Sequence, residues 1–141
     1  MKILIINGPN INMLGIREPN IYGRQSYDDL VNMIAEEAKR LDVYVEFYQS
    51  NHEGALIDKI QEAHGNFDGI IFNPAAYTHT SIALADAVKA VGIRTVEVHL
   101  SDISKRESYR KNSFISEVAY KTVTGKGFDG YIEALHMLTE M

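Results

Sequence analysis

Apolar runs of strand length alternate with segments of helical periodicity along almost the whole chain of 141 residues. The runs predict strands, because short apolar stretches bounded by turn residues are typical of strands buried on both faces. The segments between them carry apolar side chains three and four residues apart, which is the spacing of one helix face. Predicted strands cover residues 2–7, 43–49, 69–73, 94–99 and 118–124, and predicted helices cover residues 26–41, 53–64, 80–91 and 128–138.

This alternation predicts a parallel sheet with helices on both faces and right-handed crossovers. At this length we expect an α/β fold, a flavodoxin-like open doubly wound sheet of five parallel strands, with residues 1–141 forming a single domain. Ser26 is a candidate N-cap of the first helix, and Gly92 is a candidate stop of the third. Residues 101–116 are polar and basic, and we expect a loop there with one short helix around residues 105–111.

The loop after the first predicted strand is the most unusual segment. Residues 7–24 are rich in Gly, Pro and Asn, and loops this long are usually functional. Tyr22 lies between Arg17 and Arg24, and nearby positive charge favours the phenolate form of a tyrosine.

Ligands of such sheets bind at the carboxyl ends of the strands, so the residues that follow each strand are candidates for a site. Most of these residues are uncharged hydrogen-bonding groups or histidines, and the loop after the fourth strand adds two arginines. Together they predict a pocket for a small, polyhydroxylated anion. The set includes Asn7, Asn10, Asn51, His52, Asn73, His79, His99, Ser101, Arg106 and Arg110.

Composition excludes several other functions. A net charge of -5 argues against a nucleic-acid or anionic-membrane surface. The absence of cysteine excludes disulfides, thiolate metal sites and a cysteine nucleophile. The apolar start of the chain is too short for a signal segment or a membrane span, so we expect a cytoplasmic protein.

Common functions of flavodoxin-like domains fit poorly. A receiver domain needs acidic residues where Asn7 and Asn73 stand, and the loop after the first strand is not a flavin phosphate loop. Dinucleotide and Walker glycine motifs and a G-x-S-x-G nucleophile motif are absent from the required contexts. A zinc site could use Asp86, Glu97 and the histidines at 79 and 99, but the chain has no paired-histidine signature.

The histidines and Glu97 allow more than one interpretation. One general acid and one substrate-orienting histidine is the interpretation we prefer for His79 and His99, and we expect His64 and His136 on helix surfaces. Glu97 shares a strand face with His99. It is either a solvated or edge carboxylate or an orienting partner in the site, and the sequence leaves both open.

Five motifs, in order and across essentially the whole chain, resemble type II 3-dehydroquinate dehydratases. The resemblance implies a flavodoxin-like fold, activity without metal or cofactor in the shikimate pathway, and a homo-oligomer, a dodecamer built from trimers. The motifs are NGPNINMLGIREPNIYG, SNHEGALIDKIQEA, NPAAYTHTSIAL, EVHLSDISKRE and GKGFDGYIEAL.

The resemblance implies specific catalytic roles. Tyr22 would remove a proton from C2 of 3-dehydroquinate, with Arg17 and Arg110 holding it as phenolate. Asn10 would hold a water that stabilises the enolate. His99 would protonate the departing C1 hydroxyl, with Asn73 and Glu97 orienting the imidazole, and the product would be 3-dehydroshikimate.

The resemblance also implies the binding residues. The Leu100 N–H and Ser101 would take the substrate carboxylate, while Asn73, His79 and Arg110 would hold its hydroxyls. Asp86 would reach the pocket of a neighbouring subunit. The segment 17–24 would close over the pocket and exclude water.

Four positions depart from the usual pattern of the family. Ala85 stands where an arginine is common, Lys121 where a glycine is common, and Asp102 and Ser104 where Asn and His are frequent. None is a matched catalytic position, so they bear on assembly more than on the reaction. The alternatives are a non-catalytic ligand-binding module of the same fold and a metal-dependent hydrolase using His79 and His99.

Overall fold

The computed structural model describes residues 1–16, 25–105, 107–110 and 112–140. Its centre is one parallel sheet with the strand order β2-β1-β3-β4-β5. This is the order of flavodoxin-like sheets, and it confirms the predicted fold class. The strands are β1 (Lys2–Asn7), β2 (Tyr44–Gln49), β3 (Gly69–Asn73), β4 (Arg94–His99) and β5 (Lys121–Thr124).

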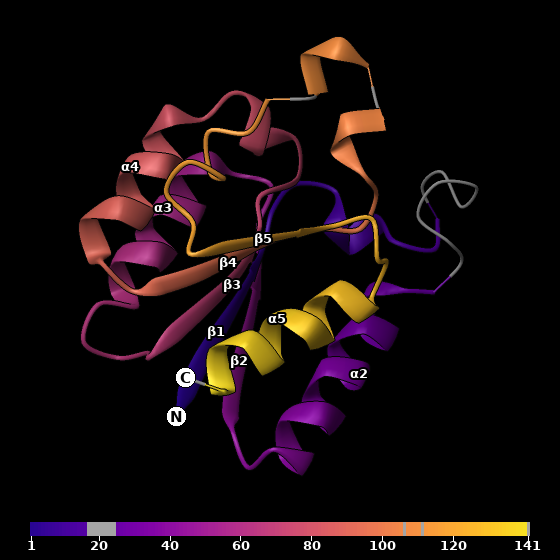
Figure 1. The fold of residues 1–141 in the computed structure, drawn as a ribbon, viewed down its shortest axis with the longest axis vertical. Helices are drawn as coiled ribbons and strands as arrows, with labels where there is room; N and C mark the ends of the chain where they lie inside the picture. Colours follow the sequence, from indigo (N-terminus) through magenta and orange to yellow (C-terminus); the bar gives the residue numbers. More distant parts are fainter. Residues whose placement is uncertain (17–24, 106, 111, 141) are drawn as a thin grey trace.

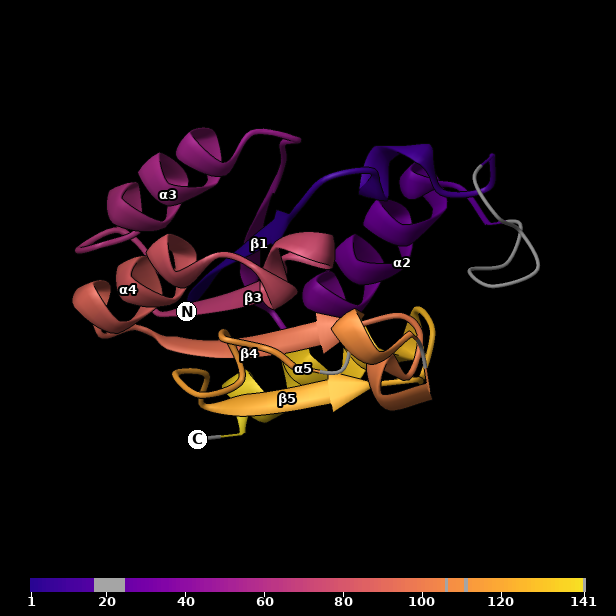
Figure 2. The same cartoon turned by 90° about the horizontal axis from the view of Figure 1, so that it is seen from above.

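Helices cover both faces of the sheet (Figures 1 and 2). The pair α2 and α5 packs on one face, and the pair α3 and α4 packs on the other. The helix bounds are α2 (Tyr27–Arg40), α3 (Glu53–Glu62), α4 (Ile82–Val91) and α5 (Asp129–Thr139).

Side-chain alternation along the strands divides the core into two halves. Ile3 and Ile5 of β1 pack with α2 and α5, whereas Leu4 and Ile6 pack with α3 and α4. All four are fully buried, as expected for a strand covered on both faces.

The predicted helix signals are confirmed at α2 and α4. The Ser26 hydroxyl accepts from Asp29 N at 3.1 Å, and Asp29 Oδ2 accepts from Ser26 N at 2.9 Å, which is a capping box. Gly92 ends α4 with φ at 67°, a conformation that costs glycine little. The helix begins at Ile82, because Ser81 is its N-cap rather than part of it.

Two predictions about the chain between β4 and β5 are wrong. In place of one helix around 105–111, the described residues of this stretch form two short 3-10 helices, η3 (Ile103–Lys105) and η4 (Ser108–Arg110). The fifth strand begins at Lys121 rather than at 118. Val118 N and Ala119 N both donate to Ile115 O, so these residues form a turn instead of extending the strand.

Two further 3-10 helices were not predicted, and both follow strands at the carboxyl edge. They are η1 (Ile11–Met13) after β1 and η2 (Ala75–His79) after β3. Figure 2 shows the loops after β1, β4 and β5 gathered at the arrowhead end of the sheet, where the site was expected.

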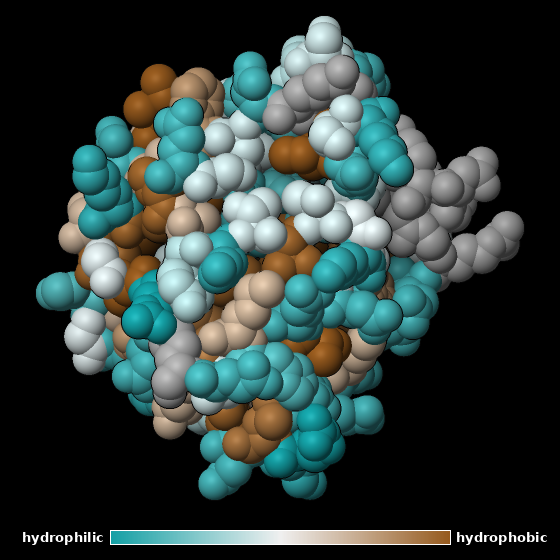
Figure 3. Space-filling view, viewed as in Figure 1, coloured by the Kyte–Doolittle hydropathy of each residue, from teal (hydrophilic) through white to brown (hydrophobic). Residues whose placement is uncertain are grey.

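The surface of the described residues is mixed in character. Figure 3 shows hydrophobic areas divided by hydrophilic side chains on the face it presents. None of the helices in the described ranges is long and apolar enough to cross a bilayer.

Candidate active site

A cavity of about 140 Å³ opens at the carboxyl ends of β1, β3 and β4. Six predicted site residues line it, so the structure brings together positions up to 91 residues apart (from 10 to 101). The rest of its lining is mainly apolar, as is usual for a small-molecule pocket. The six are Asn10, Asn73, His79, His99, Leu100 and Ser101.

The other predicted site residues are placed differently. Arg17, Tyr22 and the neighbouring Arg24 lie outside the described residues, and so does the side chain of Arg110, whose backbone ends η4. Asp86 lies on α4, is exposed, and does not line the cavity of its own chain.

His99 and Glu97 form a buried pair near the C-terminal end of β4. The imidazole Nε2 donates to Glu97 Oε2 at 2.5 Å, so the other ring nitrogen, Nδ1, is the one left for chemistry at the cavity. Glu97 is fully buried and His99 is 5% exposed. The interpretation of Glu97 as a solvated or edge carboxylate is therefore wrong, and its interpretation as an orienting partner is confirmed.

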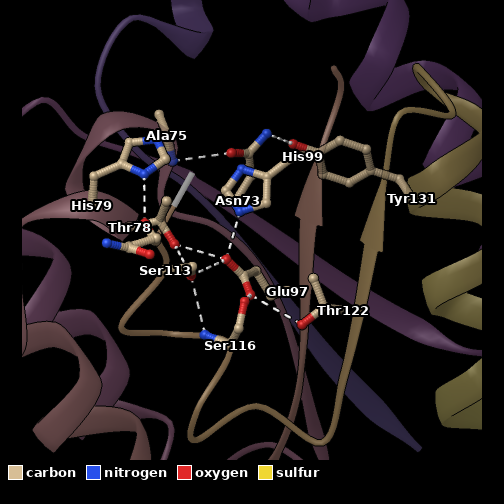
Figure 4. A network of polar contacts seen from close by, with 11 residues as sticks. Asn73, Ala75, Thr78, His79, Glu97, His99, Ser113, Ser116, Thr122 and Tyr131 are labelled. Atoms are coloured by element: carbon tan, nitrogen blue, oxygen red, sulfur yellow. Dashed lines mark hydrogen bonds and ion pairs between the residues drawn. The ribbon is translucent and has the colours of Figure 1, made fainter. Parts of the chain in front are cut away.

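Four hydroxyl groups surround the same carboxylate (Figure 4). Thr78 and Ser113 each contact Oε2 at 2.7 Å, and they also contact each other at 2.5 Å. Ser116 and Thr122 donate to Oε1, the latter at 3.0 Å. We call Thr78, Ser113, Ser116 and Thr122 the hydroxyl cage. Together with His99, the hydroxyl cage provides hydrogen-bonding partners to both oxygens of the Glu97 carboxylate.

The electrostatic consequence is a strongly acidic Glu97. Burial raises the pKa of this carboxyl, because a charge is less favourable away from water. The hydrogen bond and charge of His99, followed by the hydroxyl donors, outweigh burial and lower that pKa from 4.5 to about 2. Glu97 is therefore an anion at neutral pH, which suits it to stabilise an imidazolium at His99.

Fig. 4 also shows that Asn73 has partners other than His99. Its Nδ2 donates to the hydroxyl of Tyr131 at 2.9 Å, and its Oδ1 accepts from Ala75 N at 3.0 Å. Tyr131 in turn donates to Asn7 Oδ1 at 2.6 Å. Among the contacts of the described residues, Glu97 is the side chain that hydrogen-bonds the imidazole of His99, while the Asn73 amide bonds to Tyr131 and Ala75.

Two cavity residues hold a left-handed backbone without being glycine. Asn10 has φ at 69° and Ala75 has φ at 53°, and such conformations cluster at functional sites. An amide side chain fixes each of them. Asn51 Oδ1 accepts from Asn10 N at 3.0 Å, and Asn73 Oδ1 accepts from Ala75 N.

His79 is held by the segment that follows η4. Its Nδ1 contacts Asn112 O at 2.7 Å, and since a carbonyl can only accept, Nδ1 carries the hydrogen of that bond. His79, at the end of η2 after β3, and His99, at the end of β4, line the same cavity, as predicted. Within the described ranges, no three His, Cys, Asp or Glu side chains lie close enough to hold a metal ion.

The sequence model of the family described as dehydroquinase class II matches residues 1–139 of the chain. The chain belongs to this family. Dehydroquinase class II membership confirms the resemblance carried by the five motifs, and the matched region includes every residue that lines the cavity.

Individual members of the family are similar over nearly their full length. The chain is 53% identical over 131 residues to a 3-dehydroquinate dehydratase from Campylobacter hominis, covering 93% of this chain and 84% of the relative. It is 52% identical over 141 residues to a 3-dehydroquinate dehydratase from Caldicellulosiruptor bescii, covering 99% and 97%. The crystal structure of a type II dehydroquinase from Butyrivibrio crossotus superimposes with a TM-score of 0.97 at 55% identity, covering 98% and 97%.

Reasoning from the dehydroquinase motifs did not identify the hydroxyl cage or Tyr131. The cage residues belong to η2, to the turn before β5 and to β5, and serine and threonine are too common to stand out. One signal was available, because a parallel pairing of β4 with β5 places Thr122 beside Glu97. Tyr131 lies on the buried face of α5, and the sequence pattern there predicts only that an aromatic residue packs in the hydrophobic core.

Proposed function

We propose that the protein is a 3-dehydroquinate dehydratase that converts 3-dehydroquinate to 3-dehydroshikimate by anti elimination of water, as a step of the shikimate pathway. The observation that carries the proposal is the buried Glu97–His99 pair at the wall of the cavity. In a chain of this family, it provides an imidazole positioned for acid chemistry beside an anion.

The base in this proposal is Tyr22, acting as phenolate with Arg17 and Arg110 as its cationic neighbours. It takes the proton from C2 of the substrate, alpha to the C3 ketone, and an enolate forms. Asn10 holds a water that donates to the enolate oxygen, and such preorganised donors stabilise developing charge. The support for Asn10 is its position at the cavity with a backbone fixed by Asn51.

The acid is His99. As the enolate collapses, the C1–O bond breaks and the leaving oxygen takes the proton from Nδ1 of the imidazolium, so water departs and a C1–C2 double bond forms. Tyr22 is then protonated and His99 neutral, and a proton passing from one to the other restores the starting state. Glu97 stays anionic throughout, which favours the charged form of the acid.

Substrate binding uses the polar lining of the cavity. The Leu100 N–H and Ser101 take the carboxylate, and Asn73, His79 and Arg110 hold the hydroxyls. The support for this assignment is that His99, Leu100 and Ser101 are consecutive in the chain and line the same cavity. No cofactor enters this mechanism.

Assembly completes the site in this proposal. Asp86 reaches the pocket of a neighbouring subunit in a dodecamer of four trimers. The support is that Asp86 is exposed on α4 and lies away from the cavity of its own chain. Light scattering of the purified protein at several concentrations tests the assembly, and a monomer would contradict it.

An ultraviolet assay tests the reaction. The product contains a carbon–carbon double bond conjugated with its ketone and carboxylate, so absorbance rises when 3-dehydroquinate is consumed. We expect turnover that survives treatment with borohydride in the presence of substrate. Loss of activity after that treatment would indicate a lysine Schiff base, and absence of turnover with 3-dehydroquinate would contradict the proposed function.

A further inference from the structure

The hydroxyl cage converges on one buried carboxylate from three separate segments. Thr78 comes from η2, Ser113 and Ser116 from the turn before β5, and Thr122 from β5. Thr78 is fully buried, like Glu97 itself. A carboxylate offers about four acceptor sites, so the four hydroxyls and the imidazole, five groups able to donate, are enough to fill them.

The distribution of these donors over the two carboxylate oxygens matters. His99 Nε2 shares Oε2 with Thr78 and Ser113, whereas Ser116 and Thr122 occupy Oε1. A proton between an imidazole and a carboxylate can reside on either partner. Donors on the same oxygen reduce its basicity, so they favour the state in which the proton stays on the imidazole.

The location of that proton decides whether His99 is a strong acid. If Glu97 takes the Nε2 proton, the remaining imidazole is neutral, and its Nδ1–H is far too weak an acid to release a leaving hydroxyl. If Glu97 stays anionic, the imidazolium keeps both protons and can donate from Nδ1. Among the described residues that contact Glu97, His99 is the titratable one and the others carry hydroxyls.

We propose that Thr78, Ser113, Ser116 and Thr122 are positioning residues that keep Glu97 anionic and thereby keep His99 in its acid form. The expected effect on kcat rests on the proposed function, whereas the expected effect on the ionisation of Glu97 does not. The cage acts through Glu97, since none of the four hydroxyl residues lines the cavity.

The turn before β5 gives the cage a second consequence. Ser113 follows Asn112, whose carbonyl accepts from His79, so one short segment contacts His79 directly and His99 indirectly, through Glu97. The Ser113 hydroxyl also accepts from Ser116 N at 3.1 Å, which holds the turn in the shape that presents both serines to Glu97.

Two threonines offer a matched test. Thr78→Val removes a buried cage hydroxyl, and Thr95→Val removes a buried hydroxyl of β4 that donates to Ile93 O instead. Each substitution replaces one hydroxyl by a methyl group of similar size. Thr78→Ser restores the hydroxyl, and Thr78→Val combined with Ser113→Ala removes both hydroxyl donors from Oε2.

Two readouts separate positioning from stability. The first readout is kcat and KM for 3-dehydroquinate as a function of pH. These constants are measured at a temperature at which every variant is folded. The ionisation of Glu97 is followed by ¹³C NMR of protein labelled at glutamate Cδ, with the resonance assigned by its loss in Glu97→Gln. This second readout needs no substrate.

We expect Thr78→Val to lower kcat about tenfold with KM unchanged, the double variant to lower it further, and Thr78→Ser to recover most of it. The Glu97 resonance should titrate at higher pH in the double variant than in wild type and Thr95→Val. Equal kcat in Thr78→Val and Thr95→Val, or an unshifted Glu97 titration, would overturn the proposal. If the wild type fails to turn over 3-dehydroquinate, the proposed function fails, and the Glu97 titration still decides the role of the cage.

Discussion

The hydroxyl of Tyr131 and the amide of Asn73 are joined by a hydrogen bond of 2.9 Å between residues 58 positions apart. This bond connects α5 to the end of β3. Because the Asn73 amide also accepts from Ala75 N, the helix helps to hold the strained backbone that lines the cavity. Burial raises the pKa of Tyr131, which keeps its hydroxyl a neutral donor.

Tyr131→Phe should therefore affect both stability and binding. The substitution leaves Asn7 Oδ1 and Asn73 Nδ2 without their buried partner, and we expect a loss of about 1–3 kcal/mol in the free energy of unfolding. KM for 3-dehydroquinate should rise as Ala75 loses its fixed acceptor. Urea denaturation and steady-state kinetics measure the two effects. Tyr120→Phe at an exposed position is the control, and an effect no larger than in that control would contradict the prediction.

Gly8 is required by close approach of two chain segments. A Cβ at this position would lie 2.6 Å from Pro74 O, and Gly8 N donates to Asn73 O at 2.7 Å. We expect Gly8→Ala to displace the loop that carries Asn10, lowering both stability and kcat. Gly54→Ala is the matched control, since nothing lies within 4 Å of a Cβ there and alanine favours helix α3. Similar melting temperatures for the two variants would count against this role of Gly8.

Two carboxylates should make stability depend on pH in acid. Hydrogen bonds from Arg40 and then His136 lower the pKa of Glu37 from 4.5 to about 2, and the pKa of Glu97 is also about 2. Below pH 4.5 the unfolded chain binds protons at these groups and the folded protein does not, so stability falls as pH drops from about 4.5 to about 2. For buried Glu97, the total loss in the free energy of unfolding over this pH range is on the order of 3 kcal/mol.

Urea denaturation at a series of pH values measures this dependence. Glu37→Gln and Glu97→Gln should each flatten the loss of stability between pH 4.5 and 2, because each removes one group whose protonation opposes folding. Glu133→Gln, which removes an exposed partner of Lys126, is the control. Curves for all three variants with the wild-type slope would show that neither pair contributes.

The base assignment is tested by Tyr22→Phe. Without the phenolic oxygen no group in the proposed mechanism accepts the C2 proton, so we expect dehydration to fall to background. The protein should keep its melting temperature and still bind product-like ligands, as measured by calorimetry. Substantial residual turnover would mean that another group is the base.

Much of the fold could be predicted because its signals are local. The strands β1, β3 and β4 have the predicted bounds, since β1 and β3 are short apolar runs and β4 alternates Val96 and Val98 with polar residues. The capping box at Ser26 and the stop at Gly92 depend on residues within one helical turn. The chain between β4 and β5 was predicted less well, because its structure depends on bonds to Glu97 and Thr78 rather than on its own periodicity.

The site could be predicted in position but not in detail. Parallel topology alone brings Asn10, Asn73 and His99 to one edge of the sheet. Alternation along β4 could not decide whether Glu97 is buried or exposed to solvent. Its burial depends on the turn before β5, which covers this side of the strand. The left-handed backbone of Ala75 was also unforeseen, since its cause is the side chain of Asn73.

The measurement that tests the central claim most directly separates the two halves of the elimination in His99→Ala. Exchange of the C2 proton in deuterium oxide reports the base, and formation of 3-dehydroshikimate reports the acid. If Tyr22 and His99 have separate roles, dehydration should fall by about 10² to 10⁴ while C2 exchange continues at a much higher rate. Equal loss of exchange and dehydration would contradict the claim that His99, held by Glu97, is the acid that releases the hydroxyl.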